Sequence, residues 1–73
     1  MYESVKRSYF HEDIGEYSAY DVLLVSEKGE IICRAEDVTT ENQIADCLVH
    51  LFNACKLKHW EFTSAIQSAM AFI

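Results

Sequence analysis

The stretch YSAYDVLLVSEKGEIICRA (residues 17–35) carries the clearest signal for the fold. Two segments rich in β-branched, aromatic and aliphatic residues, 17–25 and 30–35, flank the tetrapeptide SEKG. Such residues favour strands, and the glycine that ends this short connection can take the left-handed conformation that a tight hairpin loop needs. The stretch therefore predicts a β-hairpin with Gly29 in its loop.

Apolar side chains alternate onto both faces of the first predicted strand: Leu23 and Val25 point one way, Val22 and Leu24 the other. A lone hairpin is not stable in water, so the rest of the chain must pack on it. Residues 1–16 show weak periodicity and leave two alternatives open, a short third strand or a helical turn. Gly15 is expected in a turn.

The C-terminal part is predicted to be helical. Thr40 and Gln43 have the spacing of a capping box at a helix start. Two stripes with the same helical offsets follow, eighteen residues apart: Ile44, Leu48, Leu51, Phe52 and Cys55, then Phe62, Ile66, Ala69, Met70 and Ile73. We expect two helices joined by a turn near residues 57–59, with one continuous helix as the alternative.

These elements predict a single small α+β domain over residues 1–73, in which the hairpin, with or without a third N-terminal strand, packs on two C-terminal helices. A chain of 73 residues removes only about 60% of its surface from water on folding. Its 51% hydrophobic content is too high for a disordered segment. The absence of proline and the presence of only two glycines give no sign of a linker or second domain.

The charge balance excludes several classes of function. Twelve acids against six bases give a net charge of −6, which disfavours direct binding to nucleic acid or to anionic membranes. No apolar run has the length of a signal-peptide core or a membrane span. We therefore expect a cytoplasmic protein that binds neither nucleic acid nor membrane.

No pattern predicts catalysis, a cofactor or a metal. Cys47, His50, Cys55 and His59 resemble metal-ligand spacing, but along one helix they would span about 18 Å and could not surround one ion. The three cysteines are expected to be free thiols, with Cys47 and Cys55 buried. The sequence HED (11–13) is expected in a solvated loop, since no nucleophile can be placed beside it.

The last predicted helix lacks charge. From Thr63 to the end of the sequence there is no charged residue, and 19 of the 30 residues from 44 to 73 are apolar. One hairpin cannot cover so much apolar surface, so we expect a homodimer, with a groove for another protein as the alternative. The predicted self-association residues are Trp60, Phe62, Ile66, Met70 and Phe72.

Acidic residues give the functional hypothesis. Residues 12–46 hold ten acids against Lys28 and Arg34, a pattern that suits docking on a basic protein surface. We expect a non-enzymatic module that inhibits or regulates its partner, by analogy with anti-restriction and anti-CRISPR proteins that occupy basic nucleic-acid-binding grooves. The alternatives are a purely structural homodimer and a Cys/His metal-binding protein. The predicted partner-binding residues are Asp21, Glu27, Glu30, Glu36 and Asp37.

Overall fold

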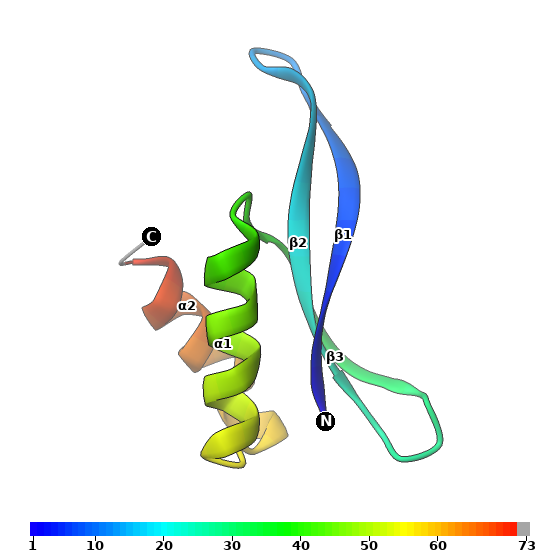
Figure 1. The fold of residues 1–73 in the computed structure, drawn as a ribbon, viewed down its shortest axis with the longest axis vertical. Helices are drawn as coiled ribbons and strands as arrows, with labels where there is room; N and C mark the ends of the chain where they lie inside the picture. The colour runs from blue at the N-terminus through cyan, green and yellow to red at the C-terminus, as the bar shows by residue number, and fades with distance from the viewer. Residues whose placement is uncertain (72–73) are drawn as a thin grey trace.

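The computed structural model describes residues 1–71, which form a three-stranded antiparallel sheet followed by two helices (Figure 1). The strands β1 (Tyr2–His11), β2 (Gly15–Val25) and β3 (Ile31–Thr39) lie in the order β1-β2-β3. After them come α1 (Asn42–Ala54), a short 3-10 helix η1 (His59–Glu61) and α2 (Phe62–Met70). The predicted α+β fold is confirmed, and the N-terminal segment takes the third-strand alternative.

Both sheet turns use glycine in the left-handed region. Gly29 has φ of 87° and its N–H donates to the Ser26 carbonyl at 3.0 Å. Gly15 has φ of 86° and follows a turn in which the Ile14 N–H donates to the His11 carbonyl at 3.2 Å. The predicted loop position of Gly29 is confirmed, whereas Gly15 lies directly after the turn, as the first residue of β2. The two hairpins therefore build a meander from consecutive strands.

The helices cover one face of the sheet, and Tyr2 joins the two layers. Its ring lies 5.4 Å from Phe52 of α1 and 5.8 Å from Phe62 of α2, measured between centroids. Its hydroxyl donates to the Leu57 carbonyl at 2.6 Å, and its backbone exchanges two hydrogen bonds with the Asn53 side chain. The buried core consists of Tyr2, Val22, Val38, Phe52, Phe62 and Ile66.

The chain reverses between the helices without glycine or proline. Lys56 takes a positive φ of 53°, and the Leu57 N–H donates to the Phe52 carbonyl at 3.0 Å, which is the arrangement of a Schellman motif. This confirms the turn near residue 57 and excludes the single continuous helix. The predicted capping box is wrong: α1 starts at Asn42, and no side chain caps it. Instead, the Thr39 hydroxyl accepts a hydrogen bond from the Glu41 N–H at 3.1 Å.

Candidate protein-binding surfaces

The first hairpin extends well beyond the rest of the sheet. β3 last pairs with β2 at Tyr20 and Thr39, whereas β1 and β2 continue to pair as far as His11 and Gly15. We call residues 6–20 the arm. Figure 1 shows that the arm projects past β3 and both helices. Both of its faces are therefore free of the helical layer.

A bulge in β3 marks the base of the arm. Between the pairs Val22–Ala35 and Tyr20–Thr39, β2 has one residue, Asp21, where β3 has three. Such a bulge bends its strand and ends regular pairing. It also places Asp37, whose φ is 53°, so that its backbone N–H donates to the Asp21 carboxylate at 3.0 Å.

Asp21 is a buried, fully partnered carboxylate. Only 1% of it is exposed, and it accepts hydrogen bonds from the Tyr9 hydroxyl, from Arg7 Nη1 at 3.2 Å and from the Asp37 N–H. Burial alone would raise the pKa of Asp21, but the hydrogen bonds from Tyr9, Asp37 and Arg7 lower it overall. Asp21, a predicted partner-binding residue, thus lies with its carboxylate buried and already hydrogen-bonded within the chain.

Two tyrosines brace the arm against the bulge. The Tyr9 and Tyr17 rings stack at 5.9 Å on the sheet face opposite the helices, and the Tyr17 hydroxyl donates to Asp37 at 2.5 Å. Burial, followed by the bond to Asp21, raises the pKa of Tyr9, and the bond to Asp37 raises the pKa of Tyr17. Both hydroxyls thus stay protonated as donors at neutral pH. The arm is held at its base by five side chains, Arg7, Tyr9, Tyr17, Asp21 and Asp37.

The tip of the arm combines apolar and acidic side chains. Phe10 and Ile14 are 72% and 69% exposed. Glu12 and Asp13, in the turn between them, and Glu16, which pairs with Phe10 across the strands, are exposed too. Residues 8–18 contain no lysine or arginine. The tip therefore presents two exposed apolar side chains next to several carboxylates.

The net charge of the chain is concentrated at the arm end. Residues 6–21 and 36–46 hold eight acids against two bases, a net −6, whereas the rest of the chain holds four of each. α1 begins on the side of the arm, which adds Glu41 and Asp46 to that side (Figure 1). We call residues 6–21 and 36–46 the acidic end.

The remaining predicted partner-binding residues divide into two places. Glu36 and Asp37 lie in the bulge, where Glu36 is 3.9 Å from both Arg7 and Arg34. Glu27 and Glu30 are exposed in or beside the β2–β3 loop, at the opposite end of the molecule from the arm tip (Figure 1). The predicted acidic residues therefore do not form one surface in the structure.

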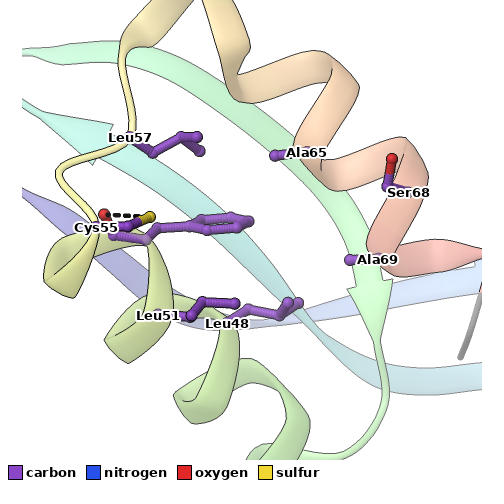
Figure 2. Close-up of a pocket in the computed structure, with 8 residues that line it drawn as sticks. Leu48, Leu51, Cys55, Leu57, Ala65, Ser68 and Ala69 are labelled. Atoms are coloured by element: carbon purple, nitrogen blue, oxygen red, sulfur yellow. Dashed lines mark hydrogen bonds between the residues drawn. The ribbon is translucent and has the colours of Figure 1, made fainter.

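An apolar groove of about 380 Å³ lies between α1 and α2 (Figure 2). Leu51 stands at its edge with 55% of its surface exposed. Cys55 is exposed as well, as is Cys47, so the prediction that these two thiols are buried is wrong. Leu51 and Cys55, two residues of the predicted apolar stripe on α1, therefore face this groove rather than the core. Its lining residues are Leu48, Leu51, Phe52, Cys55, Leu57, Ala65, Ser68 and Ala69.

The predicted self-association residues also lie in different environments, some in the core and some on the surface. Phe62 and Ile66 are buried in the core. Trp60 is 70% exposed and lines a hollow that shares Leu57, Ala65 and Ser68 with the groove. Met70 is 46% exposed on α2 but does not line the groove. Phe72 lies outside the described residues. An interface on this side would therefore use the outer faces of α1 and α2.

Within residues 1–71, no group of three or more His, Cys, Asp or Glu side chains is placed to hold a metal ion. In the same part of the chain, no helix is long and apolar enough to cross a membrane. Comparisons with protein-family models, curated proteins and solved structures found no match. Functional inference therefore starts from the arm, the acidic end and the groove.

Proposed function

We propose that this chain is a non-enzymatic protein-binding module that regulates or inhibits its partner by docking its acidic end on a basic surface. The observation that carries the proposal is the segregation of charge, which gives the acidic end the whole net charge of −6. A field of one sign at one end of a small protein steers an oppositely charged partner toward that end and suppresses other orientations.

The tip of the arm supplies contacts that charge alone does not. Exposed Phe10 and Ile14 are side chains that fill pockets on a partner, and anchors of this kind carry most of the energy of an interface. The hydrogen bonds of Tyr9 and Tyr17 also hold the arm in one conformation before it binds. An arm already held in its binding conformation loses less entropy when it docks.

Basic grooves that hold nucleic acid are one class of target that fits. An acidic arm lying in such a groove would exclude the phosphate backbone by competition, so that binding becomes inhibition. Under this proposal, affinity falls as salt rises, because exposed charge pairs are screened over about 10 Å at 0.1 M salt.

Paired charge reversals test the proposal. Glu12→Lys with Glu16→Lys changes the tip of the arm, and Glu27→Lys with Glu30→Lys is a control with the same charge change at the other end. Immobilised wild type and both variants are used to capture proteins from a cell extract at low and raised salt. Each captured protein is then purified and titrated directly with the three chains and with competing duplex DNA.

The expected result is a basic protein whose binding weakens with salt and is lost in the arm variant but not in the loop variant. Competition with duplex DNA would identify a nucleic-acid groove as its binding site. Binding that resists salt and survives the arm reversal would refute docking through the acidic end. Equal loss in both variants would show that net charge, rather than the arm, controls binding.

A further inference from the structure

We infer that a second copy of this chain covers the groove between α1 and α2, so that two copies pair groove to groove. This inference is independent of docking through the acidic end. We call the groove together with the neighbouring Trp60 the helical face. Three observations support the inference: the amount of exposed surface, the distribution of charge and the shape of the groove.

The chain exposes more surface than a compact protein of its mass. Its solvent-accessible area is 5297 Å², whereas a folded monomer of 8.4 kDa exposes about 4,600 Å². The excess of about 700 Å² is close to the ~800 Å² that each partner buries in a standard interface. The projecting arm contributes to this excess as well as the helical face, so the excess is an upper limit on what the open helical face adds.

Charge favours a second copy as the occupant. No charged side chain occurs from residue 62 to residue 71, and the groove residues all lie outside the acidic end. Two copies that each carry −6 repel one another through their acidic ends, whereas pairing through the helical faces avoids bringing those residues into the contact. A basic partner would gain no electrostatic attraction from an uncharged face.

The helical face combines an apolar groove with an exposed leucine at the edge of that groove. Leu51 projects from α1 directly beside the groove, as Figure 2 shows. Ala65, Ser68 and Ala69 on the α2 side are small and let another helix approach closely. About a twofold axis, Leu51 of each copy can fill the groove of the other, which is the reciprocal contact that a closed dimer requires.

Solution mass measures this contact directly. Sedimentation velocity over a dilution series, with reductant to prevent disulfides through Cys47 or Cys55, is expected to give twice the chain mass of 8.4 kDa. Leu51→Glu puts a charge into the contact from an exposed position. Ser68→Glu does the same from α2 without removing an apolar side chain. Both variants are expected to sediment as monomers while keeping the wild-type far-UV circular dichroism.

Two controls make the result specific. Ile32→Glu adds the same charge at a β3 position of matched exposure, 53% against 55% for Leu51, and is expected to remain dimeric. Phe10→Ser with Ile14→Ser removes the apolar tip of the arm and is also expected to remain dimeric. A monomeric wild type across the series, or a dimer that survives both groove variants, would overturn the inference. Loss of the dimer in the arm variant would instead place the arm in the contact.

Discussion

Removing the Tyr9 hydroxyl should destabilise the fold more than removing the Tyr17 hydroxyl. The two rings stack on each other, and each hydroxyl donates to one aspartate. Tyr9 bonds a carboxylate that is 1% exposed, whereas the carboxylate of Asp37 is exposed to water. A hydrogen bond to a buried charged group contributes about 1.5–3 kcal/mol, and water can replace an exposed one.

The expected loss in Tyr9→Phe is therefore about 1.5–3 kcal/mol. A domain of this length has a total stability of about 4–11 kcal/mol, at ~0.05–0.15 kcal/mol per residue. At 4–8 °C per kcal/mol for small domains, the melting temperature should fall by about 6–24 °C. The shift in Tyr17→Phe should be less than half as large.

Urea unfolding followed by far-UV circular dichroism is the appropriate assay. If both variants keep the wild-type m-value, their midpoint shifts report stability alone. Equal shifts in the two variants would refute the view that burial of Asp21 makes the Tyr9 bond the stronger one. A negligible shift in Tyr9→Phe would show that the Asp21 cluster does not hold the base of the arm.

Further predictions concern pH, the core and one turn. The pKa of Asp21 is lowered on folding. The stabilisation of the fold by its carboxylate is therefore fully present above the unfolded pKa of 3.8 and is lost as the pH falls toward the folded pKa. In urea titrations at several pH values, Asp21→Asn should reduce the loss of stability at acid pH. Phe62→Ala should cost about 3–5 kcal/mol in the same assay, whereas Phe10→Ala, at an arm position 72% exposed and outside the helical face, should change the midpoint little. Gly29→Ala should cost about 1 kcal/mol, measured likewise, because its φ of 87° disfavours a side chain.

The parts of the fold that sequence could predict are those with local signals. The hairpin around Gly29 combines strand-forming segments with a glycine turn only a few residues apart. The two helices follow from stripes such as Leu48 and Phe52, whose spacing is visible within a few turns. The length of β1 could not be read in this way, because most of its side chains in the arm are exposed and the helical layer imposes no alternating apolar pattern on them.

The burial of Asp21 could not be predicted without the tertiary structure. Its partners Arg7, Tyr9 and Asp37 lie 12 to 16 residues away along the chain, and one of them donates through its backbone from a bulge. A single aspartate within a strand gives no local sign of such a cluster. Helical spacing likewise could not decide whether Phe62 faces the core or an interface, because both positions select apolar residues.

The placement of the two proposed surfaces connects them functionally. The groove lies entirely outside the acidic end, so pairing through it leaves both arms free and gives the dimer two docking elements. Two linked elements raise the apparent affinity for a partner that has two basic sites within reach, without any new contact. Leu51→Glu should therefore weaken the capture of such a two-site partner while leaving the affinity for a single basic site unchanged. Charge reversal at Glu12 and Glu16 should abolish binding to the two-site partner and to the single site. Equal affinity of wild type and Leu51→Glu for a two-site partner would mean that the two surfaces act separately.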